Sequence, residues 1–136
     1  MSSTGKTMSI AARHILVVFV GGGIGAIARY LSVLGIKAAL GNVLAWGTLT
    51  VNLVGSFLIG AASALVDREI LSESLRLALM TGVLGGFTTF SAFSLETLAH
   101  LTGGSPLKGV LEIVLNVGGG IFLAALGYAV ARRMLG

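Results

Sequence analysis

The residues best suited to hold an ion lie in one stretch, residues 81–97. It includes two adjacent glycines, Gly85 and Gly86, four hydroxyl side chains within seven residues, Thr88, Thr89, Ser91 and Ser94, and two aromatic rings three positions apart, Phe90 and Phe93. A hydroxyl can donate or accept a hydrogen bond, and an aromatic ring has a positively polarised edge. The stretch lies inside a long apolar segment, where polar or unwound backbone is tolerated only beside protein or a water-filled cavity. We therefore interpret it as the lining of a pathway.

Composition places these residues in a membrane protein. The 136-residue chain is 55% hydrophobic and only 10% charged, with a mean hydropathy of +1.00, and one helical span needs about 20 apolar residues. Four segments meet this length, and they predict an all-α protein with a single four-helix transmembrane domain over residues 1–136: residues 15–34, 44–66, 75–101 and 110–130. Four helices are few for enclosing a pathway, so we expect an oligomer.

Charge and residue types exclude several classes of function. The isoelectric point near 10.1 reflects basic residues at the segment ends, which is typical of membrane proteins and does not indicate nucleic-acid binding. The chain has no cysteine, so disulfides and thiolate chemistry are excluded. His14 and His100 stand near segment ends without a catalytic or metal-ligand constellation, and we predict that the protein is not an enzyme.

The first segment combines small residues with a charge. Gly21, Gly25 and Arg29 follow one another at four-residue steps, which places them on one helical face. The glycines predict a packing seam, because small residues let two helices approach closely. Arg29 has two open interpretations: a charge that marks a partner or pathway, and a side chain that reaches the membrane surface.

The second and fourth segments each carry a polar stripe. Thr48 and Asn52 stand one helical turn apart, as do Glu112 and Asn116. An intramembrane asparagine often hydrogen-bonds across a helix interface, so a structural role competes with a role in the pathway. Glu112 stands near the start of its segment, where we expect its side chain to reach water and to favour the helix dipole.

In the third segment, Gly85 and Gly86 predict a break in the helix just before the hydroxyl-rich stretch. A break leaves carbonyl and amide groups that need partners, and a bound ion is one such partner. At about 100° per residue, Phe90 and Phe93 fall on one helical face. Such a pair usually only fills a packing gap, but the flanking hydroxyls and the break favour a place in the pathway.

Three signatures occur in order along the chain. They are Gly25-Ala26-Ile27-Ala28-Arg29, then Gly47-Thr48-Leu49-Thr50-Val51-Asn52-Leu53-Val54-Gly55, then Thr81-Gly82 followed by Gly85-Gly86-Phe87-Thr88-Thr89-Phe90-Ser91-Ala92-Phe93-Ser94 and Glu96. Together with the chain length and the four spans, these signatures resemble those of the Fluc (CrcB-type) fluoride channels, and the resemblance covers nearly the whole chain.

The resemblance implies an antiparallel dimer with two fluoride pores. The implied fluoride pathway has phenyl rings, amides and hydroxyls as its lining: Phe90, Phe93, Asn52, Thr48, Ser91, Ser94 and Asn116, with Glu112 at a further position of the track. A structural sodium ion at the dimer centre is implied, held by the backbone carbonyls of Gly85 and Thr88. Arg29 and Glu96 match charged residues of the family. The location implied is the inner or plasma membrane, in which the chain passes the bilayer several times.

The distribution of basic residues bears on how the copies pair. Basic residues are more frequent on the side of the termini: Lys6, Arg13, Arg68, Arg76, Arg132 and Arg133, against Lys37, Lys108 and, if its side chain reaches the membrane surface, Arg29 opposite. This bias predicts both termini in the cytoplasm. A chain that inserts in both orientations should show little bias, so a heterodimer with an oppositely oriented homologue stays open beside the dual-orientation homodimer that we favour.

Two positions depart from the family pattern. Ala92 replaces the threonine that is usual between the two phenylalanines, which removes a hydroxyl. Glu112 stands where the family usually has tyrosine or serine, and its carboxylate would repel fluoride unless it were paired or protonated.

The resemblance therefore implies a fluoride-selective channel that exports fluoride passively and relieves its toxicity. Two alternatives remain. A proton-coupled small multidrug exporter would need a titratable carboxylate near the middle of its first helix, where this chain has glycines and an arginine. A non-transporting membrane scaffold would use the polar stripes only for assembly.

Overall fold

The computed structural model describes residues 3–41 and 44–136, with side chains from residue 9 onward. All regular secondary structure in these residues is helical. The first two spans are α1 (Ser3–Leu40) and α2 (Trp46–Asp67). The third consists of α3 (Glu73–Arg76), the π-helix η1 (Leu77–Leu84), α4 (Gly85–Phe87) and α5 (Phe90–Thr102). The fourth consists of α6 (Pro106–Ile113), the π-helix η2 (Val114–Gly119) and α7 (Gly120–Met134).

Four stretches are long and apolar enough to cross a membrane, which confirms the prediction of four spanning helices: Ser9–Leu40, Trp46–Asp67, Glu73–Thr102 and Pro106–Met134. The first is much longer than the predicted segment 15–34. It ends only where Gly41 takes a φ of 71°, the left-handed conformation that commonly terminates a helix. Positions 42–43 of the connection to α2 lie outside the described residues, as does the side chain of Lys6.

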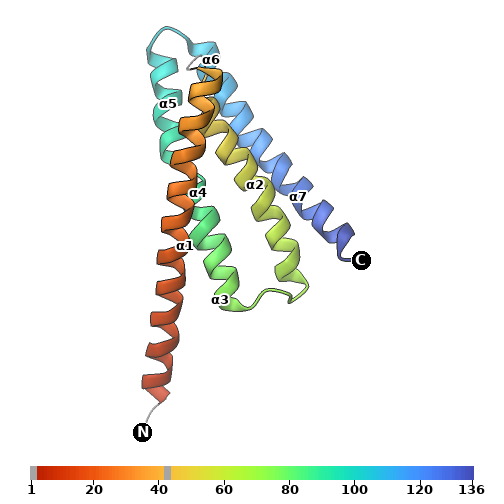
Figure 1. The fold of residues 1–136 in the computed structure, drawn as a ribbon. Coiled ribbons are helices and arrows are strands. Elements are labelled where there is room, and N and C mark those ends of the chain that lie inside the picture. The colour runs from red at the N-terminus through yellow and green to blue at the C-terminus, as the bar shows by residue number, and fades with distance from the viewer. Residues whose placement is uncertain (1–2, 42–43) are drawn as a thin grey trace.

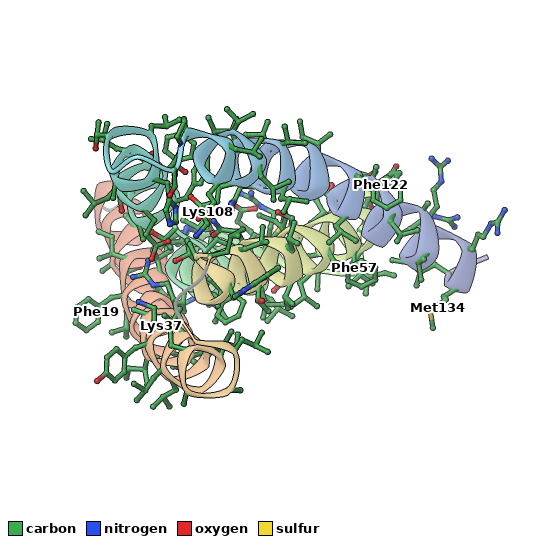
Figure 2. All side chains as sticks on the ribbon, turned by 90° about the horizontal axis from the view of Figure 1, so that it is seen from above. Phe19, Lys37, Phe57, Lys108, Phe122 and Met134 are labelled. Carbon is green, nitrogen blue, oxygen red and sulfur yellow. The ribbon has the colours of Figure 1, made fainter. Side chains whose placement is uncertain are left out.

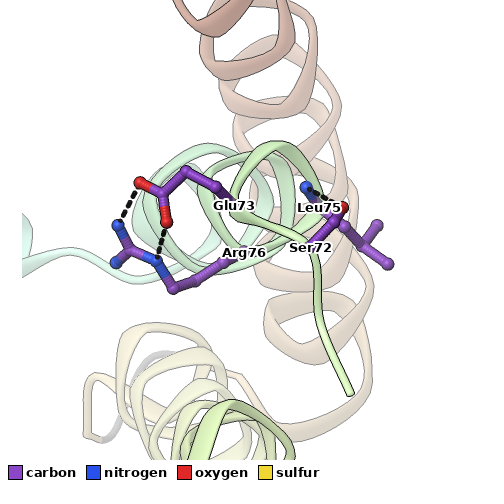
Figure 3. Close-up of polar contacts among 4 residues, drawn as sticks. All are labelled: Ser72, Glu73, Leu75 and Arg76. Atoms are coloured by element: carbon purple, nitrogen blue, oxygen red, sulfur yellow. Dashed lines mark hydrogen bonds and ion pairs between the residues drawn. The ribbon is translucent and has the colours of Figure 1, made fainter. Parts of the chain in front are cut away.

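The third span begins at a polar cap (Figure 3). The Ser72 hydroxyl accepts a hydrogen bond from the Leu75 N–H at 3.4 Å and so occupies one of the unpaired donors at the helix start. Arg76 pairs with the Glu73 carboxylate at 2.7 Å. Arg13 on α1 donates to the Ser74 hydroxyl. These contacts fix the start of the span beside α1.

Glycines let the backbones of neighbouring helices touch. Figure 1 shows α1 running alongside the third span, and α2 beside α7. A Cβ at Gly25 would lie 2.1 Å from the Val83 carbonyl oxygen, and one at Gly60 would lie 1.9 Å from that of Ala124. The packing seam predicted for Gly21 and Gly25 is therefore present, and it holds α1 against η1 and α4.

The protomer has a small core and a large apolar surface. Its buried hydrophobic residues are Leu49, Val51, Ala62, Ala64, Leu84 and Phe93. Large side chains such as Phe19, Phe122 and Met134 are mostly exposed, and Figure 2 shows that they lie at the outside of the helix assembly. A surface of this kind suits contact with lipid or with another membrane helix.

Candidate functional site: a polar groove at an interruption of the third span

The third span is interrupted at Thr88 and Thr89. Their φ/ψ angles are −85°/160° and −152°/118°, which is extended backbone between α4 and α5. The Thr88 N–H and hydroxyl both donate to the Leu84 carbonyl at 3.0 Å and complete the preceding helix. Thr89 begins α5, because its hydroxyl accepts from the Ala92 N–H at 3.2 Å. The remaining polar groups of the Thr89 backbone are free to bond elsewhere.

The side-chain amide of Asn52 binds this freed backbone. Its Oδ1 accepts from the Thr89 N–H at 2.8 Å, and its Nδ2 donates to the Thr89 carbonyl at 3.0 Å. In a continuous helix the Thr89 N–H would donate to the Gly85 carbonyl. The asparagine replaces that bond, so a side chain of α2 stabilises the interruption in the third span.

The second N–H of the Asn52 amide is also engaged. Nδ2 donates to Oδ1 of Asn116 at 2.9 Å, and Asn116 in turn donates to the Glu112 carbonyl at 3.1 Å. An amide NH₂ has two donors, and both of those of Asn52 are used. An anion can therefore receive a hydrogen bond from Asn52 only where it displaces Asn116 or Thr89.

A groove of about 410 Å³ lies beside this network. Its polar and aromatic lining comes from α2, the interruption, α5 and η2: Asn52, Ser56, Thr88, Thr89, Phe90, Phe93 and Asn116. The rings of Phe90 and Phe93 meet edge to face, with centroids 5.4 Å apart and an interplanar angle of 68°. Phe90 is 75% exposed and Phe93 only 7%. One ring thus packs inside the protomer, and the other borders the groove on an uncovered side.

Other predicted pathway residues do not line this groove. Thr48 is buried, one turn before Asn52 on α2. Ser94 is exposed and donates to the Phe90 carbonyl at 2.9 Å. Ser91 is exposed, and its hydroxyl lies 3.3 Å from that of Thr89. The structure therefore brings together the asparagines and the aromatic rings, while the two serines contact the backbone and cap of α5.

The predicted charged and carbonyl groups lie around the interruption. Arg29 on α1 is half-buried and donates to the Thr88 carbonyl at 3.4 Å, so its guanidinium has a partner inside the protein. Gly85 begins α4, and its carbonyl does not receive the hydrogen bond that the Thr89 N–H would donate in a continuous helix, because that N–H donates to Asn52. Glu96 on α5 has one buried carboxylate oxygen, Oε2, without a hydrogen-bond partner.

The expectation that Glu112 reaches water is wrong. The residue is 1% exposed, and its Oε1 accepts from the Ala45 N–H at 3.1 Å. Its Oε2 accepts from the Thr97 hydroxyl at 3.2 Å, and Nδ1 of His100 lies 3.0 Å from Oε1. The imidazole is not aligned for a good hydrogen bond, so this contact is an ion pair when the ring is protonated. Two hydrogen-bond donors and one protonatable ring, from two other parts of the fold, enclose the carboxylate.

Sequence reasoning overlooked Thr97 and the partnership of His100 with Glu112. A signal was available in the turn that joins α5 to α6. Thr97 precedes Gly104 by seven residues, and Glu112 follows Ser105 by seven, so a tight antiparallel turn brings the two side chains level. The turn could be predicted from the sequence. The burial of the Glu112 carboxylate could not, because it depends also on Ala45 at the start of α2, which is distant in the sequence.

Comparison with known proteins gives a consistent result. Residues 16–128 match the family described as "CrcB-like protein, Camphor Resistance (CrcB)". A protein of Rhizobium meliloti named "Fluoride-specific ion channel FluC" is 43% identical over 90% of this chain and 98% of its own length. Proteins of the same name from Thermus thermophilus and Chlorobium chlorochromatii are each 45% identical, over 89% and 92% of this chain and 97% of their own lengths.

Proposed function

The chain belongs to the CrcB family, and from this premise we propose that it is a channel that lets fluoride leave the cytoplasm passively and so relieves fluoride toxicity. The similar proteins are named fluoride-specific ion channels, and four apolar helices make this a multi-pass membrane protein. One observation in this chain carries the proposal: a single groove at the interruption of the third span is lined from three separate segments of the chain, by Asn52, by Phe90 and Phe93, and by Asn116.

The chemistry of the groove suits a small anion. Fluoride is strongly hydrated, so a pathway must replace its water with several donors without binding it too tightly to leave. The positive edges of the Phe90 and Phe93 rings attract an anion without adding a fixed charge. The Asn52 amide supplies neutral N–H donors, which an arriving fluoride would take over from the Asn116 oxygen. Weak, exchangeable contacts of this kind favour conduction.

The driving force comes from the membrane and not from a coupled ion. Moving one elementary charge through a membrane potential changes its free energy by about 2.3 kcal/mol per 100 mV. A negative cytoplasm therefore expels an anion through any open selective path. Fluoride that enters as neutral HF and dissociates inside would leave in this way, and no catalytic step is needed.

We further propose that two copies pair in opposite orientations, with the interrupted third span near the shared face. The exposed Phe90 ring supports this, because a second protomer could cover the open side of the groove. Two copies would then form two pathways. The excess of basic residues at the ends of the spans near the termini keeps a heterodimer with an oppositely oriented homologue as the alternative.

A structural sodium ion would fit the same face. Oxygen ligands suit a hard cation, and the Gly85 carbonyl has lost its helical donor to Asn52. The Thr88 carbonyl receives only the long Arg29 contact of 3.4 Å, and a carbonyl has a second lone pair. Gly85 and Thr88 would hold the ion, whose charge would stabilise the unpaired carbonyls of two protomers.

The sodium proposal predicts that the dimer is more stable in sodium than in an organic cation. Purified protein should lose its dimer, measured by light scattering during heating, at a lower temperature in N-methylglucamine chloride than in sodium chloride of equal ionic strength. Potassium chloride is the control for monovalent salt in general. Equal dissociation temperatures in all three salts would argue against a specific sodium site.

The proposed function is tested by fluoride efflux from liposomes that contain the purified protein. A fluoride electrode should record rapid loss once a potassium ionophore balances the charge, while vesicles loaded with chloride retain their anion. Folded protein without fluoride efflux would favour a scaffold. Proton flux that depends on an added drug would instead favour a multidrug exporter.

A further inference from the structure

The end of the groove holds an anion that belongs to the chain itself. Glu112 lies one helical turn before Asn116, and Thr97 lies one turn after Phe93, so both stand just beyond the groove lining on their own helices. The Glu112 carboxylate is almost fully buried there. A charge removed from water in this way is costly unless other groups replace the lost hydration.

The groups around the carboxylate have the character of an anion site. Ala45 precedes α2, and its N–H points to the carboxylate at 3.1 Å, at a helix start where a negative charge is favoured. The Thr97 hydroxyl donates at 3.2 Å, and the His100 ring lies at 3.0 Å. A backbone N–H at the start of α2, and a hydroxyl and a protonatable ring of α5, thus converge on one negative group.

We propose that Glu112 is a rate- and specificity-determining residue: its carboxylate occupies the last anion site of the fluoride path, and His100 offsets its charge. The inference rests on the proposed channel function and extends it to a residue that departs from the family pattern. Lys108 lies one turn before Glu112 on α6, and Glu96 lies one turn before His100 on α5. Among the described residues, only His100 makes a charge contact with Glu112.

The proposal gives opposite effects for the two members of the pair. Like charges repel strongly in a poorly solvated site, so the carboxylate slows an approaching fluoride. Glu112→Gln keeps the size and removes the charge: its amide oxygen can still accept from the Ala45 N–H, and its NH₂ can donate to the Thr97 hydroxyl. It should raise fluoride efflux by about tenfold. His100→Gln leaves the carboxylate without its counter-charge, and it should lower efflux by about tenfold.

The experiment compares initial fluoride efflux from liposomes containing wild-type protein, Glu112→Gln or His100→Gln at equal protein content. Opposite changes support the proposal. If efflux changes in the same direction in both variants, or does not change, the proposal is overturned. Glu112 would then serve only to join α6 to α5 and to the start of α2 by hydrogen bonds. If Glu112→Gln does not form a dimer, His100→Gln decides alone, because the side chain of His100 is partly exposed and its replacement should leave the protein folded. Reduced efflux in His100→Gln then supports the proposal, and wild-type efflux overturns it. A wild-type protein without efflux would instead refute the channel function itself.

Discussion

Phe90→Ile is expected to reduce fluoride efflux by up to about tenfold while the protomer still folds. The ring borders the groove and contacts Phe93 edge to face. An aromatic contact of this kind contributes about 0.5–1.5 kcal/mol, and 1.4 kcal/mol corresponds to a factor of ten. Because the side chain is 75% exposed, little packing within the protomer is lost. Efflux from liposomes and the melting temperature of the purified protein are the measurements.

Phe19→Ile is the matched control for this substitution. Phe19 is 77% exposed, lies on α1 and points outward, away from the other helices. The same chemical change there should leave efflux unaltered. Phe93→Ile offers a second comparison: its ring is buried, so it should lose efflux and also about 1 kcal/mol or more of stability. Wild-type efflux in Phe90→Ile would show that this ring only contacts lipid or a partner protomer.

The four spans could be predicted from the sequence because they depend on length and composition alone. Long apolar segments must form helices in a bilayer, since every backbone group needs an internal partner. Their ends were less predictable. Nothing in the apolar pattern of residues 15–34 shows that α1 continues to Leu40, because helix continuation past the apolar core depends on caps such as Gly41.

The two π-helical segments show a different limit. The sequences of η1 and η2 do not distinguish a π-helix from an α-helix, because the wider turn changes only which carbonyl each N–H reaches. That choice follows from packing against neighbouring helices, such as the close contact of Gly25 with Val83. Periodicity in one segment contains no information about the shape of its neighbour, so the change from α-helical to π-helical hydrogen bonding could not be predicted.

The site was predictable in its residue types but not in its bonds. Amides, hydroxyls and aromatic rings in polar stripes indicated Asn52, Phe90 and Phe93, and these do line one groove. The sequence did not show that both N–H groups of Asn52 are already bonded, to Thr89 and Asn116. The sequence also predicted that Glu112 is near water, because the residue stands close to the start of its span and therefore close to the membrane surface. Burial of that side chain is a tertiary property, set by α5 and by the start of α2.

The bonding of Asn52 makes Asn52→Asp the most damaging single substitution that we expect. Aspartate keeps an acceptor for the Thr89 N–H but loses both donors. Its second oxygen would face the Thr89 carbonyl and the Asn116 oxygen, which lie 3.0 and 2.9 Å from the present nitrogen. The change adds a negative charge beside the groove and leaves buried acceptors unpaired, at about 1–3 kcal/mol each. Fluoride efflux should fall to that of protein-free vesicles.

Asn52→Leu separates the two causes of that loss. Leucine has a similar size and also removes the contacts with Thr89, but it adds no charge. If the charge blocks the path, Asn52→Leu should retain a low, measurable efflux while Asn52→Asp retains none, with both proteins dimeric by light scattering. Equal loss in both variants would mean that the support of the interrupted helix matters more than the charge. Near wild-type efflux in Asn52→Asp would remove Asn52 from the pathway, because a fixed carboxylate at a fluoride-binding amide must repel the ion.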